Sequence, residues 1–170
     1  MIKCFFFDRD GVLIKDYGYF FDKSKIKWLK GAINSIKIFK RKKIKVIVIT
    51  NQSGIARGFF EENDLNKFHE QMNLELKKKN AKIDKFYFCP FHPNGSVKKY
   101  SKKSNLRKPN NGMILQALKK FNLKNSECFM VGDKRSDYLC AKKSNIKFEY
   151  KKKYSLEKQI KNILNSSNDI

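Results

Sequence analysis

The fold of this chain is decided by the stretch Cys4-Phe5-Phe6-Phe7-Asp8-Arg9-Asp10-Gly11. An unbroken apolar run leads there directly into two aspartates and a glycine. Such a short continuous run is typical of a strand that is buried on both faces. Two carboxylates at the end of a strand can divide catalysis between a nucleophile and a proton donor. A polar turn with capping aspartates is the alternative explanation.

Similar apolar runs recur along the chain, at residues 46–50, 86–89 and 128–131, with a weaker one at 146–150. Between them, apolar residues recur at helical spacing. This alternation predicts an α/β domain with a doubly wound, Rossmann-like parallel sheet and helices on both faces. The three expected helix faces are Ala32, Ile33, Ile36 and Phe39; Leu65, Phe68, Met72 and Leu76; and Met113, Leu115, Ala117, Leu118 and Phe121.

The length of 170 residues fits one domain of ordinary size. We expect that domain to cover residues 1–150 and to bear two specificity loops, at about 16–28 and 90–109, which form a minimal cap. Long inserts at strand ends commonly carry specificity. Residues 151–170 are expected to form a C-terminal helix and tail of the same domain.

The composition is strongly basic, with 39 Lys and Arg against 16 Asp and Glu and a net charge of +23. Only five of the 39 are arginine, the residue best suited to bidentate contacts with phosphates and bases. We therefore expect no nucleic-acid partner. No apolar run approaches the ~20 residues of a membrane span, and the four cysteines are scattered like buried free thiols. These features predict a cytoplasmic protein with no membrane partner.

Polar motifs follow the other expected strands. Thr50-Asn51-Gln52-Ser53-Gly54 offers a hydroxyl, amides and backbone N–H groups that can cradle a phosphate. The acids of Gly132-Asp133-Lys134-Arg135-Ser136-Asp137 can hold Mg²⁺, which prefers oxygen ligands. Arg107-Lys108-Pro109 adds fixed positive charge. Because parallel strands end at one edge of a sheet, these motifs together predict a phosphate site with a metal ion.

These motifs resemble those of the haloacid dehalogenase (HAD) superfamily of phosphatases. The resemblance covers about residues 4–145, and its most specific part is Asn51-Gln52-Ser53-Gly54-Ile55-Ala56-Arg57-Gly58. It points to the small, minimally capped branch that contains heptose 1,7-bisphosphate 7-phosphatases and histidinol phosphatases. The implied activity is Mg²⁺-dependent removal of the 7-phosphate of D-glycero-D-manno-heptose 1,7-bisphosphate by a monomer, in heptose biosynthesis such as that for lipopolysaccharide.

The resemblance also implies roles for the catalytic residues. Asp8 would attack phosphorus and become an aspartyl phosphate, and Asp10 would first give and then take a proton. Thr50 and Lys108 would hold the phosphoryl oxygens.

The implied Mg²⁺ ligands are the carboxylates of Asp8 and Asp133 and the backbone carbonyl of Asp10. Asp137 would either orient a metal-bound water or serve as an ordinary helix N-terminal acid. The substrate-binding residues that the resemblance implies are Asp16, Tyr17, Gly18, Tyr19, Asn51, Gln52, Ser53, Arg57, Arg107 and Lys134, with Arg107 and Lys134 as a site for a second phosphate.

One departure concerns a structural zinc that relatives hold with Cys-x-His and Cys-x-Cys pairs. Here only Cys89 remains, and the other three positions are Phe91, Ser104 and Leu106. Four ligands are needed to close a tetrahedral zinc site, so we expect no structural zinc. The 90–106 loop should instead be ordered by packing of Phe91, Val97, Tyr100 and Leu106, with His92 as a loop residue and His69 as a core or boundary residue.

Other functions stay open at this point. Histidinol phosphate or another small phosphomonoester could be the substrate, and a nucleic-acid 3′-phosphatase could use the same Asp-x-Asp-Gly chemistry. A catalytically inactive scaffold is a third alternative. The sequence does not decide which anomer of the bisphosphate would be preferred.

Overall fold

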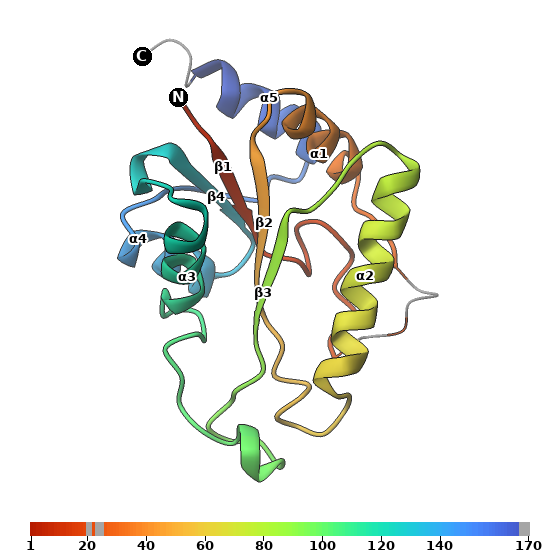
Figure 1. Cartoon of the computed structure of the whole chain (residues 1–170), viewed down its shortest axis with the longest axis vertical. Coiled ribbons are helices and arrows are strands. Elements are labelled where there is room, and N and C mark those ends of the chain that lie inside the picture. The colour runs from red at the N-terminus through yellow and green to blue at the C-terminus, as the bar shows by residue number, and fades with distance from the viewer. Residues whose placement is uncertain (20–21, 23–25, 167–170) are drawn as a thin grey trace.

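The computed structural model describes residues 1–19, 22 and 26–166, and its centre is a five-stranded sheet in the order β3-β2-β1-β4-β5 (Figure 1). All neighbouring strands run parallel. The predicted doubly wound parallel sheet is therefore confirmed. Its strands are β1 (Cys4–Phe7), β2 (Lys45–Asn51), β3 (Lys85–Cys89), β4 (Cys128–Gly132) and β5 (Lys147–Tyr150).

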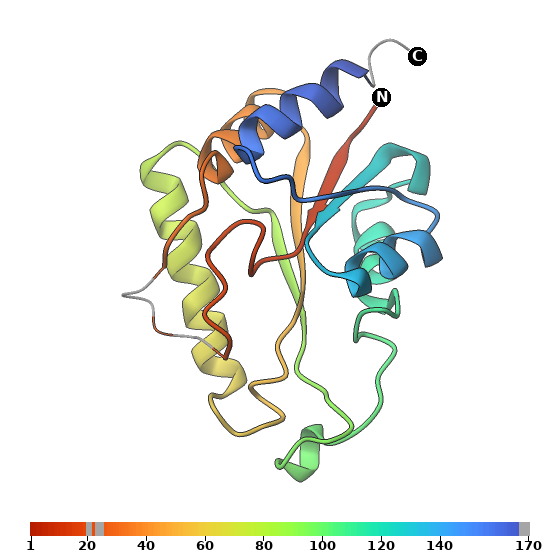
Figure 2. The ribbon, with the colours of Figure 1, turned by 180° about the vertical axis from the view of Figure 1, so that it is seen from behind.

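Helices cover both faces of the sheet (Figures 1 and 2). Because successive strand residues point to opposite faces, Phe5 and Phe7 join one hydrophobic core while Cys4 and Phe6 join the other. The first core packs under α1 (Ala32–Arg41), α2 (Glu62–Lys78) and α5 (Leu156–Ser166). The second packs under α3 (Gly112–Phe121) and α4 (Arg135–Lys143).

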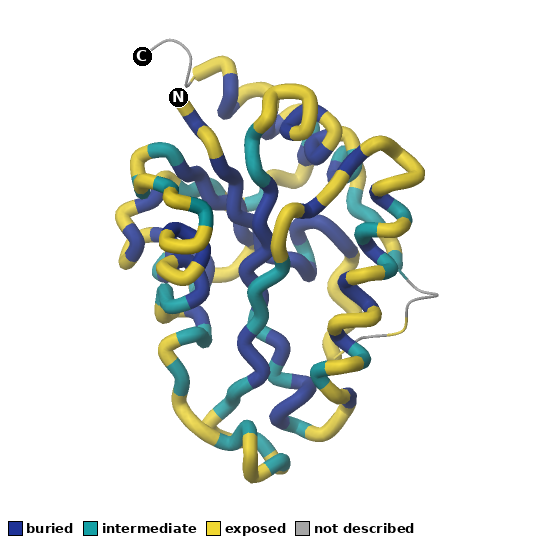
Figure 3. Tube along the Cα trace, in the orientation of Figure 1, coloured by how far each residue is buried: buried dark blue, intermediate teal, exposed yellow. Residues whose placement is uncertain are grey.

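Burial follows the position of each strand in the sheet (Figure 3). All residues of β1 and β4 are buried, whereas the edge strands β3 and β5 are mostly intermediate or exposed. Double coverage explains why the central strands read as continuous apolar runs.

Two features differ from the pattern expected for the helices. Leu115 was placed on the buried face of α3, but it is 51% exposed, and Ile114 is buried in its place. The four-residue spacing from Ile114 to Leu118 keeps both on one face of a helix. Helix α4 has few apolar residues and gave no apolar periodicity by which to predict it.

The chain between the strands contains two short 3₁₀ helices, η2 (Lys98–Tyr100) and η3 (Asn125–Glu127). Parts of the expected 16–28 loop, residues 20–21 and 23–25, lie outside the described residues, as does the tail at 167–170. All four cysteines are buried and free, as predicted. Among the described helices, none combines the length and apolar character that crossing a membrane requires.

Candidate active site

The functional residues gather where β1, β2 and β4 end. Strand register pairs Phe7 with Val48 on one side and with Val131 on the other. Asp8, which follows β1, therefore lies between the end of β2, which carries Thr50, and the end of β4, which leads to Asp133. Three motifs distant in sequence thus meet at one edge of the sheet, where open α/β sheets bind ligands.

Lys108 joins these motifs electrostatically. Its Nζ lies 2.9 Å from Asp8 Oδ1 and 2.6 Å from Asp137 Oδ1, and it donates to the carbonyl oxygen of Ile49 at 2.8 Å. Burial disfavours the charged ammonium, but the two carboxylates outweigh it and raise the pKa of Lys108 above its usual value. An ammonium has three N–H donors, so in this arrangement all of them are used within the protein.

Asn51 fixes the backbone of Lys108. Its side-chain oxygen accepts from Lys108 N at 3.0 Å, and its side-chain nitrogen donates to Lys108 O at 3.0 Å. This two-point contact ties the end of β2 to the 90–109 segment. Asn51, expected only to bind substrate, therefore also positions the buried lysine.

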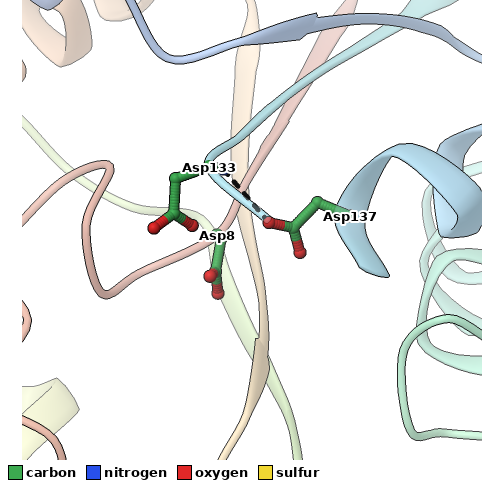
Figure 4. Close-up of side chains that lie close together, drawn as sticks. All are labelled: Asp8, Asp133 and Asp137. Atoms are coloured by element: carbon green, nitrogen blue, oxygen red, sulfur yellow. Dashed lines mark hydrogen bonds between the residues drawn. The ribbon is translucent and has the colours of Figure 1, made fainter. Parts of the chain in front are cut away.

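Three carboxylates form an acidic cluster beside Lys108 (Figure 4). Asp8, Asp133 and Asp137 each bring an oxygen within 4.8 Å of the others. Asp137 is already occupied, because its Oδ2 accepts from the backbone N–H groups of Asp133 and Lys134 at 3.1 and 3.0 Å and its Oδ1 pairs with Lys108. Asp8 and Asp133 are the members with capacity for another ligand.

The negative charge of Asp133 is offset only in part, by the neighbouring Lys134. Burial, together with the nearby carboxylate of Asp8, raises the pKa of Asp133 to about 6. Its Oδ2 lies over Gly11, where a Cβ atom would come within 2.3 Å, and Gly11 has φ +82°. A glycine is thus required for this approach. Crowded carboxylate oxygens with a raised pKa suit a hard divalent cation, so the residues present fit Mg²⁺.

Asp10 lies beside this cluster and is held on both oxygens. Arg9 donates from Nε to Oδ1 at 3.0 Å and from Nη2 to Oδ2 at 2.9 Å. Gln52 Nε2 donates to the same Oδ2 at 2.9 Å and to Thr50 Oγ1 at 2.9 Å. Because Thr50 accepts here, its own hydroxyl proton is left for another acceptor.

A cavity of about 300 Å³ opens beside Asp10, Gln52 and Lys108, and its lining does not include Asp8, Thr50 or Asp133. It is lined by the expected residues Asp10, Asp16, Gly18, Tyr19, Asn51, Gln52, Ser53, Arg107, Lys108 and Lys134, and by Gly54 and Ser136, which were not singled out. The 16–19 segment, the end of β2 and the start of α4 thus share one space. The volume suits a small molecule rather than a polymer.

Some of the charged side chains that line this cavity are paired with each other. Lys134 Nζ lies 3.1 Å from Asp16 Oδ2, and both side chains are half exposed. Burial opposes ionisation of Asp16, but a hydrogen bond from Gly18 N and the charge of Lys134 together lower its pKa. Arg107 donates to the carbonyl oxygen of Phe91 at 3.3 Å, and burial, with the charge of Arg57, lowers its pKa.

Tyr17 and Arg57 do not line this cavity. Tyr17 is 45% exposed, and the ammonium of Lys15 lies 4.8 Å from the centre of its ring. The guanidinium of Arg57 lies 5.4 Å from the ring of Tyr19, and its buried Nε has no hydrogen-bond partner among the described residues. Arg57 therefore acts on the cavity indirectly, through its contact with Tyr19 and through its charge on Arg107.

Known proteins are similar to this chain in sequence and in fold. A family model described as polynucleotide kinase 3 phosphatase matches residues 3–162. The D-glycero-beta-D-manno-heptose-1,7-bisphosphate 7-phosphatase of Pasteurella multocida is 38% identical over 147 residues, 86% of this chain and 79% of that protein. A HAD-like phosphatase structure from Mesorhizobium loti has TM-score 0.80 at 30% identity, over 85% of this chain and 69% of that one. The chain belongs to the HAD-like phosphatases.

The fold agreement extends beyond the closely related sequences. A D,D-heptose 1,7-bisphosphate phosphatase from B. bronchiseptica, solved in complex with magnesium and phosphate, has TM-score 0.79 at 22% identity, over 97% of this chain and 99% of that one. This HAD-like phosphatase and that protein therefore share one fold along nearly their whole lengths.

In this HAD-like phosphatase, the four positions at which the resemblance would place zinc ligands make two local hydrogen bonds. Cys89 Sγ donates to Phe91 O at 3.9 Å, and Ser104 Oγ accepts from Leu106 N at 3.1 Å. Burial raises the pKa of the Cys89 thiol.

Side-chain packing accompanies these hydrogen bonds. The rings of Phe91 and Tyr100 lie 5.9 Å apart. Phe91 and Leu106 pack on the second core, Tyr100 packs on Ile55, Phe60 and Leu65, and Val97 N donates to Ala56 O at 2.9 Å. The packing expected of this loop is confirmed for its aromatic residues and Leu106.

Two buried residues of the site gave no signal of their own in the sequence. Arg9 stood between the two aspartates as an unassigned position, and it is fully buried. His69, on α2, was expected to be a core or boundary histidine, and at 5% exposure it is buried. Only the fold brings α2 against the end of β1, which is why their contact could not be read from spacing.

Proposed function

We propose that this HAD-like phosphatase removes the 7-phosphate of D-glycero-D-manno-heptose 1,7-bisphosphate in an Mg²⁺-dependent reaction. The observation that carries the proposal is Asp8, paired with Lys108 and next to the open carboxylate of Asp133, at the end of β1. Heptose bisphosphate phosphatases are its relatives at 33–38% identity. The cavity size and its basic rim suit a small doubly phosphorylated sugar.

The first half of the reaction transfers the phosphoryl group to Asp8. An oxygen of Asp8 forms a bond to phosphorus while the bond from phosphorus to the sugar O7 breaks, and protonated Asp10 delivers a proton to O7. The ammonium of Lys108 keeps Asp8 ionised and oriented, and the Thr50 hydroxyl donates to a phosphoryl oxygen.

The second half releases phosphate. Asp10, now ionised, takes a proton from water as the water oxygen attacks phosphorus, and the bond between phosphorus and the Asp8 oxygen breaks. Inorganic phosphate leaves, and Asp10 is again protonated. One carboxyl group therefore serves as acid and then as base.

Mg²⁺ would be held by the carboxylates of Asp8 and Asp133 and the backbone carbonyl of Asp10, and it would offset the repulsion between an anionic nucleophile and an anionic phosphate. Asp137 completes the acidic cluster, with Oδ2 accepting from two backbone N–H groups and Oδ1 paired with Lys108. Its two backbone contacts hold the turn that presents Asp133.

The second phosphate of the substrate would bind between Arg107 and Lys134. Both residues line the cavity, and Lys134 would exchange its exposed pairing with Asp16 for a phosphate contact. Arg57, with its unpartnered buried Nε, would add charge behind Tyr19. We also propose that the chain acts as a monomer in the cytoplasm, where a reducing environment suits its four free thiols.

The test is a comparison of substrates at saturating Mg²⁺, with both anomers of the heptose bisphosphate, histidinol phosphate and an aryl phosphate. We expect the highest kcat/KM for the β-anomer, which the relatives' names specify. Asp8→Asn should lower turnover by on the order of 10³-fold or more, with an unchanged circular dichroism spectrum. Equal, low turnover of all four compounds would contradict the assignment of heptose bisphosphate as the substrate. Equal inactivity of the wild type and Asp8→Asn would favour a catalytically inactive scaffold protein.

A nucleic-acid 3′-phosphatase is the second candidate, and the description of the matching family model favours it. The same assay should include an oligonucleotide with a 3′-phosphate. Release of phosphate from it at a higher kcat/KM than from the sugar would replace our proposal with this one.

A further inference from the structure

Arg9 is a fully buried charge next to the acidic cluster, and its side-chain contacts converge on Asp10. The side chain is 0% exposed. Its guanidinium carbon lies 4.9 Å from the centre of the Phe68 ring, while Nε and Nη2 hold the two oxygens of Asp10. A planar guanidinium that donates hydrogen bonds to both oxygens of a carboxylate fixes the plane of that carboxylate. A lysine ammonium cannot fix the plane in this way.

The third guanidinium nitrogen of Arg9, Nη1, contacts His69. Nη1 lies 3.1 Å from His69 Nε2. Because a guanidinium can only donate, Nε2 must accept, and His69 must be the neutral tautomer with its proton on Nδ1. Burial and the charge of Arg9 lower the pKa of His69 well below its usual value, which agrees with that tautomer.

The imidazole of His69 is in turn fixed by an aromatic ring. It stacks on Phe86 with ring centres 4.2 Å apart and planes within 9°. Phe86 belongs to β3 and His69 to α2, so a helix and an edge strand together determine where the acceptor lies. The contacts run in sequence from Phe86 through His69 and Arg9 to Asp10.

We propose that Arg9 and His69 are positioning residues that hold the Asp10 carboxylate for proton transfer to the leaving group. The inference rests on the proposed function, because it assigns Asp10 the role of acid and base.

The contacts also distinguish the two oxygens of Asp10. A carboxylate offers about four acceptor positions, two on each oxygen. Oδ2 receives both Arg9 Nη2 and Gln52 Nε2, whereas Oδ1 receives only Arg9 Nε among the hydrogen bonds of the described residues. Oδ1 is therefore the atom that exchanges the proton with the sugar oxygen and later with water.

Substitutions of His69 test the proposal without removing the buried charge of Arg9. His69→Phe keeps a ring to stack on Phe86 but lacks the acceptor, and His69→Gln restores an acceptor without the ring. Each variant is assayed on the heptose bisphosphate, whose leaving group is a poor alkoxide, and on p-nitrophenyl phosphate, whose leaving group needs little protonation. We use kcat/KM because it reports the steps up to departure of the leaving group.

We expect His69→Phe to lower kcat/KM for the sugar phosphate about tenfold, part of the ~10²–10⁴-fold that a positioned proton donor contributes. The value for p-nitrophenyl phosphate should stay within about twofold, and His69→Gln should recover most of the loss. Equal losses on both substrates, or no loss on either, would overturn the proposal.

The proposed function fails separately, if the wild type cleaves neither phosphate. Nitrogen NMR of the wild-type imidazole adds a measurement that does not depend on turnover. It should find His69 protonated at Nδ1 and bare at Nε2 at pH 7, and a proton on Nε2 would exclude the contact with Arg9.

Discussion

Lys108 is the residue on which the charge balance of the site depends. It is the single cation between Asp8 and Asp137, and it is buried with both of them. A buried charge is stabilised by its partners, and removing one member leaves the others uncompensated. The residue therefore contributes to folding as well as to the site.

Lys108→Met should accordingly lower the free energy of unfolding by about 3–5 kcal/mol, measured by urea denaturation in the absence of Mg²⁺. Lys134→Met is the matched control, because its partner Asp16 is also a carboxylate but the pair is half exposed. Its loss should be at most about 1 kcal/mol. Similar losses for the two variants would contradict the assigned role of burial.

His69 gives the fold a dependence on pH. The folded state holds it neutral, whereas in the unfolded chain it accepts a proton below its ordinary pKa of 6.5. The unfolded state then binds more protons, so stability is lost as pH falls below 6.5. Besides Arg9, which contacts it directly, Glu70, Asp84 and Lys85 line the same cleft.

Unfolding free energies measured from pH 7.5 to 5 should therefore fall more steeply for the wild type than for His69→Gln. One proton accounts for a difference in slope of at most about 1.4 kcal/mol per pH unit. Parallel curves for the two proteins would show that His69 has the same pKa in the folded and unfolded states and would contradict the neutral, buried imidazole.

At the scale of elements, the site depends on which segments the sheet brings together. The motifs at Asp8, Thr50 and Asp133 could be predicted because each directly follows an apolar strand, and strand ends share an edge. The residues in contact with them could not. Arg9 meets His69 only because α2 packs beside β1, and Asp137 is occupied only because α4 starts at that distance from β4. These contacts depend on how the helices pack against the sheet, and the spacing of residues in the sequence does not predict that packing.

The 90–109 segment should be independent of zinc. Its ordering comes from Phe91, Tyr100 and Leu106 on the cores and from the hydrogen bonds of Cys89 and Ser104. Treatment with a zinc chelator should leave the melting temperature unchanged, and metal analysis should find no zinc. One equivalent of zinc per chain, lost on chelation together with stability, would disprove this.

At the scale of the whole molecule, the charge of +23 acts over a longer range than the site itself. Lysines cluster at helix ends, as at Lys77–Lys78 and Lys142–Lys143 in the last turns of α2 and α4. They complement the helix dipole there and remain solvated. Such charge attracts any polyanion, and the attraction does not depend on the sequence of the polyanion.

We therefore expect DNA to bind at low salt and to be released as salt rises, with no preference for sequence. Binding measured by fluorescence anisotropy between 50 and 200 mM salt should weaken by roughly 10³-fold or more. Turnover of the sugar phosphate should change far less over that range. Affinity for DNA that persists at 200 mM salt would indicate a dedicated nucleic-acid site.

The strand order β3-β2-β1-β4-β5 also bears on how the protein is made. The ribosome synthesises β1 before the other four strands of the sheet, yet this strand ends up in the middle of the sheet. One of its two neighbours, β4, is completed only at Gly132. A nascent chain therefore carries Asp8 without Asp133 or Asp137 beside it until β4 and the start of α4 have been made. The phosphatase acquires its acidic centre only after β4 and the start of α4 have been synthesised.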